Sequence, residues 1–497
     1  MNKKKLSKKV KQAKTKQAKV GKSQVKQTRS PWADFNYIYT LILLAYGFIT
    51  VITPNMMTLD SLGPKFLSLS ILNLISYIIL LSGKEFRSGT DQQMHLFRTP
   101  VGIAYTLFLV VALLSFFKAI NINESIINFS KLFTLFSAAY IVSIIIQNDS
   151  RHLRILAITL SLLLIVDSFT VFFHVATSTL AGKGPNIVEI KSVYSNKNIL
   201  AAAIFVKIPF ALWLLSFDKL RVRLLGLLTV FFALLATLLL STRSFYLGFI
   251  FMTITYVAFM GIRYHRKNER RQLIKLLISV GVTIALAMVL FSGVLKFLYP
   301  KPEQDKPGFD MNKLYTVDFL TRLKTITQGE GGRTLAWTNS LKLIKEHPLL
   351  GVGTGNWKVE ELKYENLTST NYIYLYKSHN DFIETTAETG IVGGLLFLSI
   401  FLLIGYNFLR AFFRRGATEK SYMYLFLPAF GIFAYSFDAF FNFPADRPEI
   451  CSLFAIYVGA GIAFSKVGSW SRVLGSSLQS AKTDSNPEPE TRNLKPE

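Results

Sequence analysis

The sequence has very little cysteine, and this alone narrows its chemistry. Cys451 is the one cysteine in 497 residues, so a disulfide within the chain is excluded. It falls inside an apolar stretch, where no thiol is placed for catalysis, and redox chemistry is not expected. Charge is also scarce, because Asp, Glu, Lys and Arg together make up 17% of the residues and apolar residues make up 51%. Such a composition excludes an ordinary soluble domain and predicts a protein whose main solvent is the lipid bilayer.

The apolar residues are grouped into stretches long enough to cross a membrane. A helix needs roughly 17 to 25 apolar residues to span the hydrocarbon core, and about twelve stretches approach or reach that length. They predict an all-α integral membrane protein with about twelve transmembrane helices. The expected spans are 36–53, 66–82, 101–117, 125–147, 155–175, 199–217, 224–240, 245–262, 273–296, 391–409, 422–441 and 449–465.

Acidic residues are the scarcer charge, with 30 Asp and Glu against 56 Lys and Arg. Much of the basic excess lies in the N-terminal tail and in short loops beside alternate spans. Positive charge in such places fixes topology and contacts anionic lipids. We therefore expect membrane lipids, and not nucleic acid, as its partner. The distribution places both termini in the cytoplasm, with the first span retained as a signal anchor.

One long loop, between the ninth and tenth spans, interrupts this series on the extracytoplasmic side. It begins with the proline-rich KPEQDKPG, and DFLTRLKTI and GGRTLAWTNSLKLIKE are then expected to be helices, the second ended by His347-Pro348. The predicted organisation is a basic cytoplasmic tail at 1–35, spans one to nine at 36–296, an extracytoplasmic catalytic loop at 297–390, spans ten to twelve at 391–465 and a disordered cytoplasmic tail at 466–497.

Three arginines are predicted on the extracytoplasmic side, where the positive-inside rule disfavours them. Arg243 lies in the tight turn STRS, Arg333 follows two glycines in the long loop, and Arg447 lies in FNFPADRPE. The planar guanidinium suits bidentate binding of phosphate. The alternative for each arginine is a side chain that only extends to the membrane surface.

A histidine lies close to the predicted mouth of the tenth span, in the stretch KSHNDFIETTAETG. Ser378 and Asp381 match a capping pattern, which predicts that Ser378 caps a helix and that His379 is its first residue. A helix N-terminus favours the neutral imidazole, and a neutral imidazole suits general-base work on a hydroxyl. The alternative is a histidine that orders the loop beneath Tyr372 and Tyr374.

Other polar features carry weaker signals. GVGTGNW at 351–357 follows no predicted strand, so we interpret it as a glycine-rich turn through which backbone, at Gly353 for example, approaches a ligand, and not as a nucleotide site. Metal-ligand spacing is absent from the outer loops, where a loose E-x-D is the nearest pattern. Asp167 and Lys207 fall at similar depth in neighbouring spans and are predicted to pair, or else to line a polar cavity.

Several short motifs occur together in this chain. They are R-x3-W at 333–337, KEHPLLGVGTGNW at 345–357, SHNDF at 378–382, STRSFYLG at 241–248 and SNKNILAAA at 195–203. The combination resembles the O-antigen ligase and polymerase superfamily of membrane glycosyltransferases, most specifically over residues 330–410. The last motif departs from the N-P-N-x-x-A element of that superfamily, because Lys197 stands where proline is usual.

The resemblance implies a GT-C-like helical enzyme that uses neither a cofactor nor a metal. Such an enzyme takes a glycan from an undecaprenyl-diphosphate-linked donor and passes it to an acceptor hydroxyl, with inversion. His379 would be the base, and Arg243 and Arg333 would stabilise the leaving diphosphate. Substrate-binding roles are expected for Asn380, Asp381, Arg447, Gly353 and Asn198.

The acceptor separates the functions that remain open. Lipid A core would make the protein an O-antigen ligase, which the span count and the single long loop favour. A second lipid-linked glycan would make it an O-antigen or exopolysaccharide polymerase, and a protein acceptor a protein O-oligosaccharyltransferase. A polar-solute transporter is the non-enzymatic alternative, and it would predict pseudo-repeated halves. For the enzymes we expect the cytoplasmic (inner) membrane, with the active site on its periplasmic side.

Overall fold

The computed structural model describes most of the helical parts of the chain. The chain divides into two compact units, Met1–Thr40 and Leu41–Glu497. Of the first unit, the described part is 36–40, which contains the opening of helix α2 (Tyr37–Ile52). The predictions for the two tails and for the DFLTRLKTI helix concern residues outside the described set. The described residues are 36–54, 62–83, 90–180, 190, 194, 196–217, 219–298, 331–364, 374–414 and 418–465.

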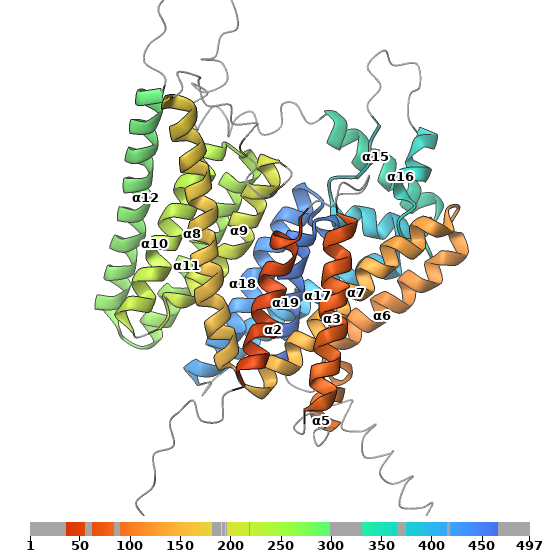
Figure 1. Cartoon of the computed structure of the whole chain (residues 1–497), viewed down its shortest axis with the longest axis horizontal. Helices are drawn as coiled ribbons and strands as arrows, with labels where there is room; N and C mark the ends of the chain where they lie inside the picture. Colours follow the sequence, from red (N-terminus) through yellow and green to blue (C-terminus); the bar gives the residue numbers. More distant parts are fainter. Residues whose placement is uncertain are drawn as a thin grey trace, which may run out of the picture. The chain divides into compact units, whose positions relative to one another are not determined.

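Every regular element in the described part of the chain is a helix, as Figure 1 shows. This confirms the predicted all-α fold. The helices after α2 are α3 (Gly63–Ser82), α5 (Thr90–Arg98), α6 (Pro100–Leu114), η1 (Ser115–Lys118), α7 (Ile122–Asn148), α8 (Arg151–Leu180), α9 (Lys197–Leu214), α10 (Leu220–Leu240), α11 (Arg243–Arg266), α12 (Arg270–Leu298), α15 (Gly331–Glu346), α16 (Trp357–Glu360), η3 (Glu361–Tyr364), α17 (Asp381–Phe413), α18 (Glu419–Phe441), η4 (Pro444–Asp446) and α19 (Pro448–Phe464).

Among the described residues, ten helices are long and apolar enough to cross a membrane. They coincide with the second to the eleventh of the predicted spans. The first and last predicted spans coincide with α2 and α19, which are shorter apolar helices. The chain is therefore a multi-pass membrane protein, as its apolar runs predict.

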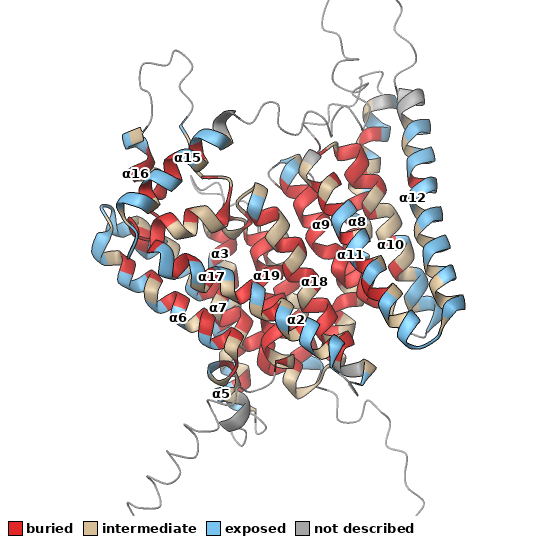
Figure 2. Ribbon diagram, turned by 180° about the vertical axis from the view of Figure 1, so that it is seen from behind, coloured by how far each residue is buried: buried red, intermediate tan, exposed pale blue. Residues whose placement is uncertain are grey.

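The spans of the second unit differ greatly in how much of their surface is buried, as the colours of Figure 2 show. In α9, 89% of the apolar window that would cross the membrane is buried, against 6% in α12. Helix α9 packs against α8, α10 and α18, whereas α12 has its main contacts with α10 and α11. A bilayer explains the difference, because an apolar helix at the edge of a bundle exposes its side chains to lipid.

The predicted pair between Asp167 and Lys207 is present. The Lys207 Nζ lies 2.7 Å from Asp167 Oδ2, and both side chains are almost fully buried between α8 and α9. The Tyr194 hydroxyl accepts a hydrogen bond from Lys207 and donates one to Asp167. A charge at this depth is costly unless it is paired and hydrogen-bonded, and here both conditions hold, so the pair has a structural explanation.

Candidate active site

The segment that carries His379 lies just before a helix, and its cap differs from the one predicted. Helix α17 begins at Asp381, and the Asn380 side chain accepts hydrogen bonds from the backbone N–H groups of Phe382 and Ile383. The prediction that Ser378 caps the helix and that His379 opens it is therefore wrong. Asparagine caps helices as well as serine does, and Asn380 is two residues closer to the apolar run.

Ser378 instead shapes the turn that aims the histidine. Its hydroxyl donates to the carbonyl of Asn380 and accepts from the Asn380 N–H, at 2.9 and 3.2 Å. Between these two residues, His379 has a φ of 57°. A left-handed conformation is unfavourable for a residue other than glycine, and such strain gathers at functional sites. The turn thus holds His379 in an unfavourable backbone conformation, which fixes the orientation of its imidazole.

A break in α17 explains the glycine-rich motif. Gly390 lies inside the helix with a φ of 75° and a ψ of 176°, so the regular bonding pattern stops there. The carbonyls of Ala387 and Glu388 accept from the N–H groups of Val352 and Gly353, at 3.0 and 2.9 Å. In return, the Ile391 N–H donates to the Pro348 carbonyl. Residues 348–357 therefore bind the break and fix the helical turns that follow His379.

The break tolerates no side chain. A Cβ at Gly390 would lie 2.1 Å from the Leu349 carbonyl oxygen, and one at Gly351 would lie 2.3 Å from the Glu388 carbonyl carbon. Both glycines also have positive φ angles, a conformation that glycine adopts at no steric cost. The motif thus brings two pieces of this chain together, backbone against backbone.

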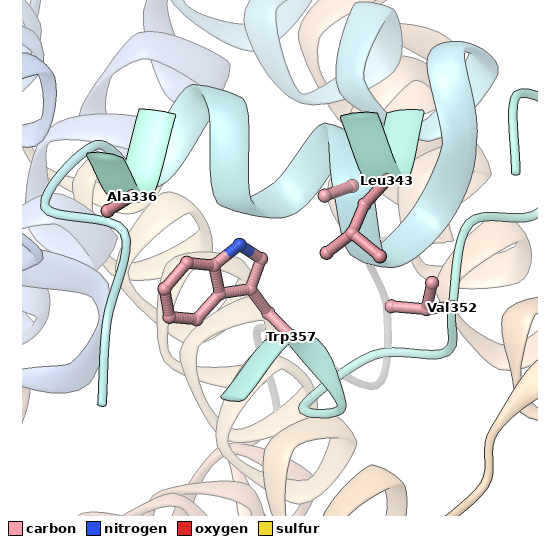
Figure 3. Close-up of a cluster of buried hydrophobic side chains, with 5 residues drawn as sticks. Ala336, Leu343, Val352 and Trp357 are labelled. Atoms are coloured by element: carbon pink, nitrogen blue, oxygen red, sulfur yellow. The ribbon is translucent and has the colours of Figure 1, made fainter. Parts of the chain in front are cut away.

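Helix α15, which carries Arg333, is fixed to the same region by a small apolar core. Figure 3 shows Trp357 between Ala336 and Leu343 of α15, with Val352 beside it. The indole N–H donates to the Ser340 hydroxyl at 2.8 Å. Helices α15 and α17 are also in direct contact.

A buried ionic network holds the other side of the histidine turn. Lys377 lies 2.9 Å from Glu384 and 3.5 Å from Asp446, and Lys131 of α7 lies 3.0 Å from Asp446. Burial alone would lower the pKa of Lys377, but the two carboxylates outweigh it and raise that pKa well above its usual value. Burial would likewise raise the pKa of Asp446, but the two lysines hold it below its usual value. Each charge is stable because its partners are in place.

The same network leads to Arg447. Asp381 accepts a hydrogen bond from the Ala445 N–H at 2.9 Å, which joins the start of α17 to η4. The Phe443 ring then lies edge-to-face with the His379 ring, at 4.9 Å between centroids. The Arg447 guanidinium lies over the Phe443 ring at 4.5 Å. One aromatic side chain thus separates the imidazole from a fixed positive charge.

The electrostatics keep His379 neutral. Burial lowers the pKa of His379, the positive charge of Arg333 lowers it as well, and that of Arg447 acts in the same direction. The Glu384 carboxylate opposes them without reversing the shift. Two of the predicted arginines are therefore close enough to act on the imidazole.

Buried polar atoms without a hydrogen-bond partner mark this region. Within the described residues they include His379 Nδ1, Asn380 Nδ2, Trp337 Nε1 and Asp438 Oδ2. Trp337 stacks edge-on against Phe440, at the end of α18 near Asp438. Buried polar groups are nearly always satisfied in proteins, so these atoms, from the turn before α17 and from α15 and α18, are available to bond a polar ligand.

Other predicted residues lie elsewhere or are only partly described. Arg243 opens α11, but its side chain is outside the described set. Asn198 is exposed in the first turn of α9, where its N–H is capped by Asn196. A Cβ at Gly353 would lie 2.7 Å from Ala119, so this glycine allows the turn at 351–357 to pack closely against Ala119. Its predicted contact with a ligand, like that of Asn198, stays a prediction.

The sequence patterns did not indicate the residues that pack against the histidine turn or pair beside it. Phe443 and the pair Lys377 and Asp446 had no motif that singled them out. The signal available was composition, since FNFPADRPE combines an aromatic, an acid and an arginine in a loop that must turn between two spans. As for metals, no group of three His, Cys, Asp or Glu side chains that would hold an ion occurs in the part of the chain that is described.

A comparison with protein families identifies the central part of the chain. Residues 228–398 match the family model described as O-Antigen ligase. The matched segment contains Arg243, Arg333 and His379, and it ends before Arg447. No curated protein matches the chain. The match covers less than half of the chain, and it supports a membrane glycosyltransferase of the ligase or polymerase type. The family predicted from the motifs is thus confirmed over residues 228–398, where the chain carries the domain of the O-antigen ligase family.

Proposed function

We propose that this protein transfers a glycan from undecaprenyl diphosphate to an acceptor hydroxyl at the extracytoplasmic face of the cytoplasmic membrane. The proposal rests on the position of His379 close to two arginines, Arg333 and Arg447. The half-buried imidazole has an Nδ1 without a hydrogen-bond partner, and burial and the charges of Arg333 and Arg447 lower its pKa. A base beside fixed cations is what displacement of a diphosphate requires.

In the proposed reaction, His379 takes the proton of the acceptor hydroxyl. The acceptor oxygen then attacks the anomeric carbon of the glycan from the face opposite the carrier. The bond between that carbon and the diphosphate oxygen breaks, and its electron pair leaves with the diphosphate. One glycosidic bond forms as another breaks, the configuration inverts, and the proton passes from His379 to the medium or to the product diphosphate.

The arginines act on the leaving group. Negative charge grows on the diphosphate as its bond to the sugar breaks, so cations fixed there before the reaction stabilise the transition state more than the ground state. We assign this role to Arg333 and Arg447, and to Arg243 at the start of α11. Asn380 would donate its free Nδ2 to the sugar or acceptor, and Asp381 would hold η4 through Ala445.

The orientation rests on the distribution of basic residues. The ends of α11 and α12 that meet at residues 263–275 are rich in Lys and Arg, and they lie at the opposite end of α11 from Arg243. By the positive-inside rule, the basic end faces the cytoplasm. The His379 end then faces the extracytoplasmic side, where a carrier-linked glycan would meet its acceptor.

The decisive experiment is reconstitution of the purified chain in vesicles with a lipid-linked glycan and a chelator. We expect loss of donor and gain of a glycan on the acceptor with an inverted linkage. Parallel reactions with lipid A core, with a second lipid-linked glycan and with a protein acceptor separate the three acceptor classes, and we propose lipid A core. Transfer that stops in chelator and returns with a divalent ion would contradict the metal-independent mechanism.

A further inference from the structure

An apolar cavity lies among the peripheral spans α10, α11 and α12, and none of the residues described around His379 lines it. Its volume is about 740 Å³, within the range of roughly 300 to 1,000 Å³ that is usual for small-molecule sites. The lining is overwhelmingly Leu, Ile, Val, Met and aromatic side chains. Its charged lining residues, Arg223 and Lys275, are both basic. Both belong to the helix ends at the basic end of the bundle.

The cavity continues into a second hollow at that end, of about 900 Å³. The two share lining residues that include Arg223, Tyr264 and Gln272. Five cationic side chains line this basic mouth against two carboxylates, and the cations are Arg223, Arg263, Lys267, Arg270 and Arg271.

The carboxylates do not neutralise this charge. Glu419 of α18 is bound by both Arg263 and Lys267, so it is fully engaged. In the described part of the chain, Arg223, Arg270 and Arg271 have no salt-bridge partner, and the same holds for Lys275 in the apolar cavity. Their positive charge is therefore available to an anionic ligand.

Aromatic side chains place the mouth at the level of lipid headgroups. Trp213, Tyr264 and Tyr424 line it, and the Trp213 indole donates to the Met423 carbonyl at 2.8 Å. Trp and Tyr gather at the boundary between hydrocarbon and water. The apolar cavity below them is then at the depth of acyl chains, and the basic mouth is at the depth of phosphates.

We infer that this paired hollow binds an anionic glycerophospholipid. Its phosphate lies in the basic mouth among Arg223, Arg270 and Arg271, and an acyl chain lies in the apolar cavity against α12. Basic pockets between helices on the cytoplasmic side of a membrane take such headgroups. The ligand also supplies the apolar contacts that α12 lacks within the protein, since only 6% of its apolar window is buried.

This site is distinct from the proposed active site. Helix α18 begins at Glu419, in the basic mouth, and ends at Phe441, beside the histidine turn. Its 23 residues separate the two regions by about 33 Å at the rise of an α-helix. The lipid proposal therefore neither uses nor requires glycan transfer, and its test is a measurement of binding.

The test compares two lipids with identical acyl chains, phosphatidylglycerol and phosphatidylcholine, by native mass spectrometry of the purified chain in detergent. The wild-type chain should bind phosphatidylglycerol more tightly. In Arg223→Gln/Lys275→Gln this preference should fall roughly tenfold or more, because each basic residue near a phosphate contributes measurably to binding. Val280→Trp, which fills the apolar cavity from α12, should weaken binding of both lipids.

Arg410→Gln is the matched control, because Arg410 is an exposed cation in the last turn of α17 and does not line either hollow. It should leave the preference unchanged. Equal binding of the two lipids by the wild-type chain would overturn the inference, as would a preference that survives in the double variant. A co-purified polyprenyl phosphate that resists exchange for phosphatidylglycerol would overturn the assigned occupant.

Discussion

Positive charge is paired with carboxylates near one end of α18 and is in excess over carboxylates near the other. At its C-terminal end, Lys377 is paired with Glu384 and Asp446, and the charges of Arg333 and Arg447 contribute to lowering the pKa of His379. At its N-terminal end, basic residues outnumber carboxylates and line an open hollow. The first arrangement fixes geometry, because each buried charge needs its partner in place. The second leaves charge available to a mobile ligand, as binding at a lipid surface requires.

The largest effects should come from the C-terminal end. We expect His379→Ala and Arg333→Ala each to reduce transfer by a factor on the order of 100 to 10,000, since each removes a group that acts in the transition state of the proposed reaction. Transfer in reconstituted vesicles, at matched protein levels, measures this. Arg333→Lys is the informative companion, because it keeps the charge and loses the planar fork.

Full transfer by either alanine variant would remove that residue from the mechanism. Equal loss in His379→Ala and in Arg410→Gln, an exposed cation at the other end of α17, would instead indicate a general defect in the preparation.

The ionic network predicts the next largest effect, on stability. Lys377→Met leaves Glu384 and Asp446 without their shared cation, and breaking a buried pair costs roughly 3 to 5 kcal/mol. We expect a clear fall in the thermal unfolding midpoint in detergent. Lys363→Met is the control, because Lys363 pairs with Glu360 while its side chain is 58% exposed, and it should change little. Similar midpoints for the two variants would show that the network is not what holds the turn.

A smaller effect on stability is expected from the glycine-rich motif. Gly353→Ala places a Cβ 2.7 Å from Ala119 at a φ of 95°, and strain of this kind costs roughly 1 to 3 kcal/mol. Transfer should fall with it, because residues 348–357 hold the break in α17. Gly405→Ala is the control, since a Cβ there meets no atom within 4 Å. A variant at 353 that is as stable as this control would mean that the turn adjusts freely.

The smallest effect is expected from a change of charge near His379. In the proposed mechanism His379 acts as a base when it is neutral, and its lowered pKa keeps it neutral to lower pH than usual. Removing the charge of Arg447 in Arg447→Gln should raise that pKa, so the acid limb of transfer should move to higher pH. A pH profile of kcat/KM for both proteins measures the shift. A limb that moves to lower pH would show that Arg447 does not act on the imidazole.

The sequence predicted the spans well, because a membrane imposes one length on every helix that crosses it. It also grouped Arg333 and Arg447 with His379, since alternation of the loops sorts residues by side. It did not predict how the motif 345–357 works, because a bond between Val352 and Ala387 depends on the break at Gly390, which no local pattern shows. It also misplaced the helix cap, since Ser378 and Asn380 are both good capping residues and tertiary contacts decided between them.

The break at Gly390 also interrupts the regular helical backbone between the two halves of α17. Lipid-facing spans respond to changes in bilayer thickness by tilting, and a continuous helix would carry that tilt straight into the turns that follow His379. The hydrogen bonds of residues 348–353 go to both sides of the break, because Val352 and Gly353 donate to Ala387 and Glu388 before it, and Ile391 after it donates to Pro348. A change of tilt in the span would therefore act on the loop at 348–353 as well as on the turns that follow His379.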